Sequence, residues 1–213
     1  MGQKDNIGFH RSADKPSHPV KTGVEFGPEM YRKIDEYIIR DWQMEDAPSI
    51  AKYANNRKIW MNLRDALPHP YSLKDAQSFI SQVIISNPIT VFAIATQSEA
   101  IGSIGLMLGK DVNRFTAEIG YWLAEPFWGK GIMTQAVKSM TAYAIHDLRL
   151  HRIFAEPYST NPASARVLEK AGFICEGILR SNAFKDGNVL DQLLYSYVGK
   201  TSEQQSPLTK TGR

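Results

Sequence analysis

Two glycines and a lysine mark the point where a strand-like segment gives way to a helical one. The local sequence is Trp128-Gly129-Lys130-Gly131-Ile132-Met133. Glycine lets the backbone approach a ligand closely, and the first turn of the following helix carries N–H groups that have no intrahelical partner. With the helix dipole, such a turn can bind a phosphate or a pyrophosphate. A tight strand–helix turn without a ligand explains the same glycines equally well.

This loop differs from both standard nucleotide-binding motifs. The chain contains no G-x-x-x-x-G-K-[ST] sequence, and Gly129-Lys130-Gly131 lacks the third glycine of the dinucleotide fingerprint. The sequence therefore argues against a P-loop enzyme and against a dehydrogenase. Cys175 is the only cysteine, which excludes an internal disulfide and a cysteine-based metal site, so no metal is expected. Its alternation with its neighbours in a strand predicts that Cys175 is buried.

Hydrophobic periodicity predicts the elements that must position this loop. The expected strands cover residues 36–41, 90–96, 100–108, 116–123, 152–156, 173–179 and 189–198. The expected helices begin near Asp46 and after Ser72, and two more cover 131–147 and 162–171. Asp46, Ser72 and Asn161 are typical helix N-cap residues, and Asp186-Gly187 favours a hairpin. Three successive short strands between 90 and 123 predict an antiparallel meander, and the whole pattern predicts a mixed α/β layer fold.

The distribution of charge limits the possible partners. The formal net charge of +3 includes +1 from residues 1–28 and +2 from residues 199–213, so residues 29–198 are close to neutral. Both terminal segments are polar and predict flexible tails around a single domain at 29–198. A neutral body without a basic stripe is a poor nucleic-acid binder. No apolar run is long enough for a membrane span and no signal peptide is visible, so a cytoplasmic location is expected.

Three segments together resemble the GCN5-related N-acetyltransferase (GNAT) superfamily, and within it the ribosomal-protein N-terminal acetyltransferases of the RimJ/RimL type. The first segment contains Asn62-Leu63-Arg64-Asp65 and Pro68-His69-Pro70-Tyr71, the second is the block 120–131, and the third is Asn161-Pro162-Ala163-Ser164-Ala165-Arg166-Val167-Leu168-Glu169-Lys170-Ala171-Gly172-Phe173. The resemblance extends over residues 36–198. One departure is Pro126, at a position where the family usually has Gln or Arg.

The resemblance implies the GNAT fold, in which a mixed, mostly antiparallel α/β sheet splays in the middle and carries helices on both faces. It also implies acetyl-coenzyme A (acetyl-CoA) as co-substrate, with the pantetheine arm between the splayed strands. Pyrophosphate would bind at residues 128–133, the N–H of Leu123 would face the thioester carbonyl, and Ser164 would lie near the sulfur. The residues implied to bind the co-substrate are Trp122, Leu123, Ala124, Trp128, Gly129, Lys130, Gly131, Ile132, Met133, Asn161 and Ser164.

Acetyl transfer to an amine requires three contributions from the protein. An amine with a pKa of about 10 must lose a proton to a base or a water relay, a fixed N–H must stabilise the carbonyl oxygen, and a hydroxyl must assist the departing thiolate. The resemblance assigns these roles to Glu118, to the Leu123 N–H and to Ser164, with Tyr158 as a rival acid. The alternatives are a structural ion pair for Glu118 and an ordinary helix-start position for Ser164. The hairpin carboxylate that can serve as base in ribosomal-protein relatives has no counterpart in residues 181–184.

The expected function is transfer of acetyl from acetyl-CoA to a primary amine by direct attack in a ternary complex. Asn62, Arg64 and Asp65 are the candidates for recognising the acceptor, which is either a protein N-terminus or a small-molecule amine. A protein of the same fold that binds or senses acyl-CoA without turnover is the alternative. A homodimer, as in many relatives, is an open question at this stage.

Overall fold

The computed structural model describes residues 30–199. The segments predicted to be flexible, 1–28 and 199–213, lie outside the described residues except for Gly199. The N–H of Gly199 donates to the carbonyl of His151 at 2.8 Å, and a Cβ at this glycine would lie 2.9 Å from Ile145 Cδ1. Gly199 is therefore packed against the domain.

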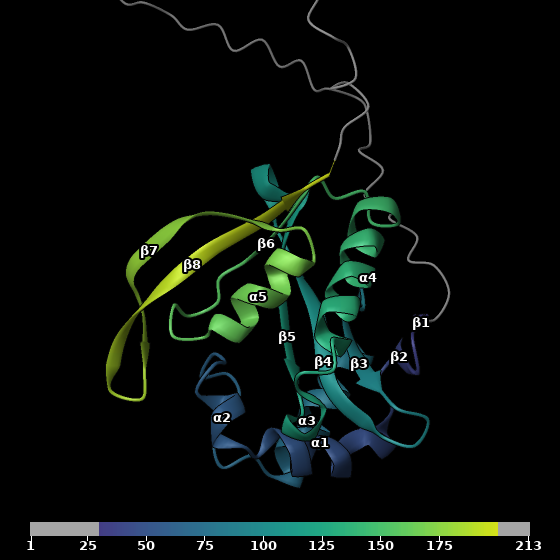
Figure 1. The fold of residues 1–213 in the computed structure, drawn as a ribbon. Helices are drawn as coiled ribbons and strands as arrows, with labels where there is room; N and C mark the ends of the chain where they lie inside the picture. The colour runs from purple at the N-terminus through teal and green to yellow at the C-terminus, as the bar shows by residue number, and fades with distance from the viewer. Residues whose placement is uncertain (1–29, 200–213) are drawn as a thin grey trace, which may run out of the picture.

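The described residues form a mixed sheet of 8 strands in the order β1-β2-β3-β4-β5-β6-β8-β7 (Figure 1). Neighbouring strands are antiparallel, except that β5 and β6 are parallel. The predicted mostly antiparallel sheet and the meander formed by the third, fourth and fifth strands are confirmed. The strands are β1 (Tyr31–Ile34), β2 (Tyr37–Arg40), β3 (Val91–Ala95), β4 (Ala100–Leu108), β5 (Thr116–Leu123), β6 (Arg152–Ala155), β7 (Ile174–Lys185) and β8 (Asn188–Val198).

The sheet splays between β5 and β6, as predicted. Residues 116–118 of β5 pair with residues 152–154 of β6, and the ladder ends at Glu118 and Phe154. β5 continues to Leu123 and stays paired with β4 along its length. The last part of β5 therefore has a strand neighbour on one side only, and a gap opens on the side of β6.

Helices cover both faces of the sheet. α4 (Ile132–His146) and α5 (Pro162–Lys170) pack on one face through a large cluster that includes Met140, Leu168 and Ile153. α1 (Ala47–Ala54) and α3 (Leu73–Ile84) pack on the other face through a smaller cluster that includes Ile50 and Ile80. Figure 1 shows α4 and α5 in front of the sheet, and α1 and α3 at its lower end. The shorter elements are α2 (Arg57–Trp60) and the 3-10 turns η1 (Met44–Asp46), η2 (Asp111–Asn113) and η3 (Glu125–Phe127).

Two of the three predicted N-caps have the expected bonding. Ser72 Oγ and Asn161 Oδ1 each accept a hydrogen bond from the N–H three residues on, at 3.2 and 3.1 Å. Asp46 precedes α1 as predicted, but its carboxylate does not cap the helix. It accepts two bonds from Arg40 instead, both at 2.7 Å. The prediction of Asp46 as a side-chain cap is wrong because a bidentate guanidinium is a stronger partner than a backbone N–H.

The C-terminal hairpin differs most from expectation. Asp186 and Gly187 have φ of 49° and 81°, as the predicted tight hairpin turn requires. β7, however, runs from Ile174 to Lys185, well beyond the predicted end at 179, with bulges that interrupt its register. β7 is an edge strand of the sheet, and Cys175 on it is exposed. The prediction of a buried cysteine is wrong, because most side chains of β7 stay exposed and do not pack into the core.

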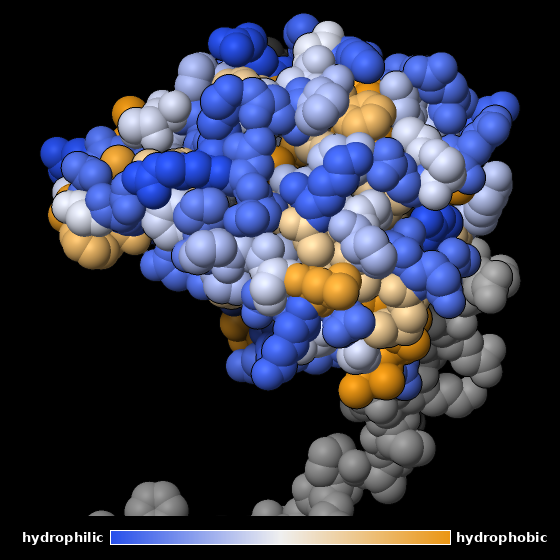
Figure 2. Space-filling view, turned by 90° about the horizontal axis from the view of Figure 1, so that it is seen from below, coloured by the Kyte–Doolittle hydropathy of each residue, from blue (hydrophilic) through white to orange (hydrophobic). Residues whose placement is uncertain are grey.

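Figure 2 shows the end of the molecule that lies lowest in Figure 1. This face is largely hydrophilic, and its apolar patches are small and separate. Within residues 30–199, no helix is long and apolar enough to cross a membrane. The same residues contain no cluster of His, Cys, Asp and Glu placed to hold a metal ion.

Candidate active site

The connection from β5 to α4 leaves backbone N–H groups free at the start of the helix. Gly131 is the N-cap of α4, and no side chain caps it. The N–H of Gln135 donates to Gly131 O at 3.1 Å, so the N–H groups of residues 132–134 precede the first intrahelical bond. Gly129 and Gly131 have φ of 76° and 79°, and a Cβ at either would meet nothing within 4 Å. These donors border open space, which suits an anionic group.

The side chains of this loop have separate tasks. Ile132 and Met133 are only 4% and 7% exposed, so they offer a ligand their main chain and pack their side chains into the core. Lys130 Nζ lies 5.1 Å from the centre of the Phe127 ring. Trp128 is exposed, and its indole N–H donates to the Leu123 carbonyl at 2.7 Å. The tryptophan therefore ties the loop to the end of β5.

The end of β5 presents one backbone N–H to the gap between the splayed strands. Ala124 N–H donates to Ile101 O at 2.8 Å, and the register pairs Leu123 with Gly102. Because antiparallel strands alternate bonded and non-bonded pairs, the N–H of Leu123 points away from β4. On that side β6 has already diverged from β5, so this donor is directed into the gap.

Ser164 lies in the first turn of α5, beside a tyrosine that the sequence analysis did not single out. Its N–H donates to Asn161 Oδ1 at 3.1 Å, and its Oγ lies 2.8 Å from the hydroxyl of Tyr121. Burial raises the pKa of Tyr121 to about 12, so this hydroxyl stays protonated at neutral pH. Tyr121 can therefore donate to Ser164 Oγ and leave the serine proton available to another acceptor.

Glu118 lies on the opposite face of β5 from Tyr121, because side chains alternate along a strand. Its carboxylate accepts a hydrogen bond from Arg64 Nη2 at 2.5 Å. The Glu118 side chain is 18% exposed and that of Arg64 is 56% exposed, so the arginine covers the carboxylate from the solvent side. The structural ion pair considered for Glu118 is thus present, and it brings together a predicted base and a predicted acceptor-binding residue.

A second carboxylate adjoins this ion pair. Glu156 directly follows β6, and its pKa is raised by burial and by the negative charge of Glu118, with Arg64 acting in the opposite direction. A carboxylate with a raised pKa is a stronger base than an ordinary one. The sequence analysis placed Glu156 at the end of a strand and gave it no role. Alternation along the strand places Glu156 on the same face as Phe154, which pairs with Glu118.

The other predicted acceptor-binding residues and the rival acid lie near Arg64. Asn62 Nδ2 donates to a backbone carbonyl of α2 at 2.9 Å, so this side chain closes the helix end. Asp65 Oδ1 accepts a bond from Lys185 Nζ at 2.7 Å. The Tyr158 hydroxyl donates to Leu63 O at 3.5 Å, and burial raises its pKa. Tyr158 therefore contacts the acceptor-side segment, whereas the Ser164 hydroxyl contacts β5.

The predicted acid and the carboxylates lie on opposite sides of the sheet. Tyr121 belongs to the cluster beneath α4 and α5, where Ser164 contacts it. Trp122 packs against the α1 and α3 cluster, on the face that Glu118 shares by alternation. A reactive group held in the gap would therefore have hydroxyls on one side and carboxylates on the other. This arrangement suits group transfer through the splay.

A surface pocket of about 440 Å³ leads to Glu118. Met107, Phe154 and Leu194 form its apolar lining, and Lys110 contributes a cation. These side chains come from strands and a turn on the Glu118 face of the sheet. The carboxylate can thus be approached from the side opposite α4.

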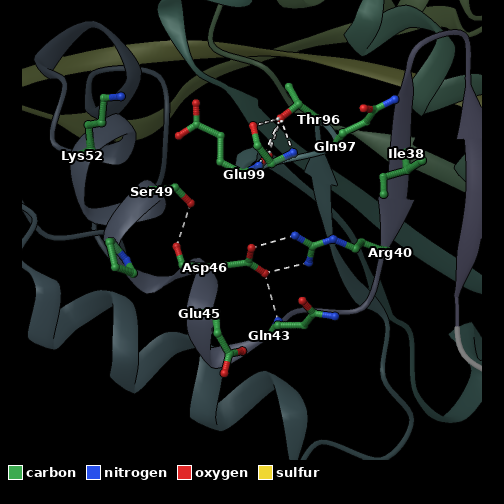
Figure 3. A pocket seen from close by; sticks show the side chains of 12 residues that line it. Ile38, Arg40, Gln43, Glu45, Asp46, Ser49, Lys52, Thr96, Gln97 and Glu99 are labelled. Carbon is green, nitrogen blue, oxygen red and sulfur yellow. Dashed lines mark hydrogen bonds and ion pairs between the residues drawn. The ribbon is translucent and has the colours of Figure 1, made fainter.

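A second pocket, of about 460 Å³, contains none of the predicted site residues (Figure 3). Figure 3 shows Arg40 directed at Asp46, and the Ser49 hydroxyl donates to the Asp46 carbonyl at 2.8 Å. The Thr96 hydroxyl donates to the backbone carbonyl of Glu99 at 3.2 Å. These polar groups already have hydrogen-bond partners within the protein. We therefore interpret them as stabilising the start of α1 and not as a ligand site.

Comparison with known proteins agrees with this geometry. The acetyltransferase (GNAT) domain family matches residues 37–174. The probable N-acetyltransferase YjcK of Bacillus subtilis (strain 168) is 43% identical over 115 residues, covering 53% of this chain and 64% of that protein. The ribosomal-protein-serine acetyltransferase of Escherichia coli (strain K12) is 34% identical over 108 residues, covering 51% of this chain and 60% of that protein. The matched stretches thus span less than two-thirds of the length of either relative.

A solved structure extends the comparison over the whole fold. The microcin C7 self-immunity acetyltransferase MccE, in complex with acetyl-CoA and AMP, has a TM-score of 0.67 at 27% identity. The match covers 78% of this chain and 93% of that one. The resemblance inferred from three sequence segments is confirmed: this chain belongs to the GNAT acetyltransferase family.

Proposed function

We propose that this protein is an N-acetyltransferase that transfers acetyl from acetyl-CoA to a primary amine by direct attack in a ternary complex. The observation that carries the proposal is the pair of main-chain donor sites, one at the start of α4 and one at the Leu123 N–H in the gap. YjcK and the E. coli relative are named as acetyltransferases, and the MccE structure contains acetyl-CoA. These names support the same co-substrate for this chain.

Coenzyme A fits the donors present. Its diphosphate would accept hydrogen bonds from N–H groups of residues 129–134, next to the ammonium of Lys130. Its pantetheine arm would lie in the gap between β5 and β6 and pass Asn161. Acetyl-CoA, when bound, supplies an activated acetyl thioester, and the remaining chemistry belongs to the side chains and amides of this chain.

The carboxylates on the Glu118 face would accept the proton of the amine. The amine nitrogen forms a bond to the thioester carbonyl carbon, and its proton passes to a carboxylate directly or through water. Arg64 already neutralises Glu118, whereas the pKa of Glu156 is raised. We therefore assign the main role in accepting the proton to Glu156, and we assign to Glu118 and Arg64 the placement of the amine.

The opposite side of the gap would assist the leaving group. The N–H of Leu123 donates to the carbonyl oxygen while negative charge develops on it. When the C–S bond breaks, the sulfur takes a proton from Ser164, and Tyr121 can replace that proton through their 2.8 Å contact. The products are the amide and coenzyme A as a free thiol.

The acceptor is a protein N-terminus or a small-molecule amine. The carboxylates of Glu118 and Glu156 beside the reaction centre favour a cationic ammonium group. The relative that acts on a ribosomal-protein serine makes a peptide with a free N-terminal serine the first acceptor to test.

Calorimetry and a thiol-release assay together test the proposal. We expect the purified protein to bind coenzyme A and to release thiol from acetyl-CoA when a suitable amine is added. The acceptor panel contains peptides with N-terminal serine or alanine, free amino acids, spermidine and an aminoglycoside. Binding without turnover on any acceptor would favour the acyl-CoA sensor instead. Failure to bind coenzyme A and acetyl-CoA would overturn both functions.

A further inference from the structure

The segment that carries Arg64 is attached to the rest of the molecule by charged groups on other elements. This segment, residues 57–65, comprises α2 and the turn after it. Its ion pairs reach η3, β5 and the β7–β8 hairpin; they are Lys58 with Glu125, Arg64 with Glu118, Asp65 with Lys185, and Arg57 with Asp186. Two of the four therefore end on the hairpin turn, far away in the sequence.

Lys185 has the least exposed side chain among these charged residues. It is 0% exposed, whereas its partner Asp65 is 72% exposed. Lys185 Nζ lies 2.7 Å from Asp65 Oδ1 and 3.7 Å from the centre of the Trp60 ring. Trp60 in turn stacks on His69, with ring centres 5.4 Å apart. A buried ammonium needs such partners, because an unpaired one is costly to bury.

Through its contact with Asp65, Lys185 is linked to the acceptor side of the site. Asp65 directly follows Arg64, which holds Glu118 at 2.5 Å. The carbonyl of Leu63, on the other side of Arg64, accepts the bond from Tyr158 at 3.5 Å. Release of Asp65 would therefore free one end of the short stretch that sets Arg64 against the carboxylates.

We infer that Lys185 is a positioning residue for the acceptor: it fixes residues 60–65 against the hairpin and thereby sets Arg64 over Glu118 and Glu156. This inference rests on the proposed function, because it names a determinant of acceptor binding in that same site. Lys185 touches neither Leu123 nor the loop at 128–133 in the described contacts. It therefore acts on the acceptor and not on coenzyme A.

Kinetics of Lys185→Met test the inference. Methionine keeps the length and apolar stem of the side chain and removes the charge, so the fold is retained. With the amine that the wild-type protein acetylates fastest in the panel above, we expect the acceptor KM to rise about tenfold. We expect kcat to change less than about twofold and the KM for acetyl-CoA to stay the same. Lys185→Arg should restore the acceptor KM, because it keeps the cation over Trp60.

Two further variants separate positioning from general stability. Asp65→Asn should raise the acceptor KM. Combining it with Lys185→Met should add little to this effect, since both substitutions break the same ion pair. Arg32→Met is the matched control. Arg32 pairs with Asp147 at 2.8 Å and lies 5.1 Å from the Tyr143 ring centre, so it has the same kinds of partner at a distant place. It should leave both KM values unchanged.

Hydrogen–deuterium exchange gives a readout that does not need activity. Lys185→Met should speed exchange in residues 57–65 and leave residues 128–134 unchanged. Unchanged exchange in 57–65, or an unchanged acceptor KM, would overturn the inference. A joint fall in kcat, acetyl-CoA affinity and thermal midpoint in Lys185→Met would also overturn the inference, because it would indicate that Lys185 is only structural. If the wild type does not turn over acetyl-CoA, the proposed function fails, and exchange still decides whether Lys185 fixes this segment.

Discussion

At the scale of single residues, the proposed acid and base lie on two faces of one strand. Tyr121 and Ser164 share a proton-carrying contact of 2.8 Å on the side of α5. Glu118 and Glu156 lie near Arg64 on the other side. In the proposed mechanism, this separation would let an acid and a base act on one thioester without neutralising each other. Each half can therefore be removed by substitution without removing the other.

The hydroxyl pair should be tested with Ser164→Ala and Tyr121→Phe. Loss of the proton donor to the sulfur should lower kcat by about 10-fold to 100-fold for Ser164→Ala. Tyr121→Phe should lower it less, because the serine keeps its own proton. Calorimetry should show that both variants still bind coenzyme A, because the main-chain donors of residues 129–134 are retained. Equal kcat in wild type and Ser164→Ala would contradict the assignment of the acid.

The two carboxylates should respond differently to amidation. Glu156→Gln should lower kcat more than Glu118→Gln, and Glu118→Gln should chiefly raise the acceptor KM. Because the folded-state pKa of Glu156 is raised, ionisation of this carboxyl destabilises the folded protein. The protein therefore loses stability as pH rises through that pKa. Glu156→Gln should therefore keep or raise the thermal midpoint at pH 7. A variant that is both inactive and less stable would argue for a structural Glu156.

At the scale of elements, local signals predicted turns and helix starts better than contacts between distant residues. The glycines at 129 and 131, the N-cap Asn161 and the hairpin turn at Asp186 act within a few residues, so sequence alone located them. The contacts of Arg64 with Glu118, and of Lys185 with Asp65, join residues far apart in the chain. Periodicity carries no information on such pairs. The length of β7 was missed because an exposed edge strand needs no hydrophobic alternation.

The start of α4 offers an element-scale prediction with a matched control. Gly131→Ala and Gly187→Ala each place a Cβ at positive φ, 79° and 81°, where no atom lies within 4 Å. Both should cost similar stability, about 1 kcal/mol. Only Gly131→Ala should weaken coenzyme A binding, by about tenfold or more, because its Cβ would enter the proposed diphosphate site. Equal coenzyme A affinity in the two variants, measured by calorimetry, would show that the diphosphate does not bind at this loop.

The link between β6, β7 and β8 predicts a pH dependence of stability. Arg152 and Ser196 hold Glu176, and they lower the pKa of this carboxyl from 4.5 to about 2. A lowered folded pKa stabilises the protein above pH 4.5, and this contribution is lost as pH falls from 4.5 towards 2. Glu176→Gln should cost about 0.5–1 kcal/mol at pH 7, since the pair is partly exposed. In urea unfolding, the difference from wild type should shrink between pH 4.5 and 3.

At the scale of the whole molecule, the proposed cofactor gap lies where only three residue pairs join β5 to β6. The strands β1–β5 and the strands β6–β8 are joined within the sheet only by the pairs at residues 116–118 and 152–154. The core beneath α4 and α5 completes the connection. A ligand in the gap would contact the start of α4, the end of β5 and the start of α5 at once. It would therefore add a bridge between the two halves.

Coenzyme A should consequently stabilise the entire domain and not only its binding loop. At a free concentration of about 100 times Kd, binding contributes about 2.7 kcal/mol, which for a domain of this size raises the thermal midpoint by about 5–10 °C. Hydrogen exchange should slow at residues 121–134 and also at β6 and α5 across the gap. Gly131→Ala should reduce both effects in parallel at fixed ligand concentration. Protection confined to residues 128–134 would mean that the diphosphate binds while the pantetheine arm stays outside, and the splay would then have no part in the reaction.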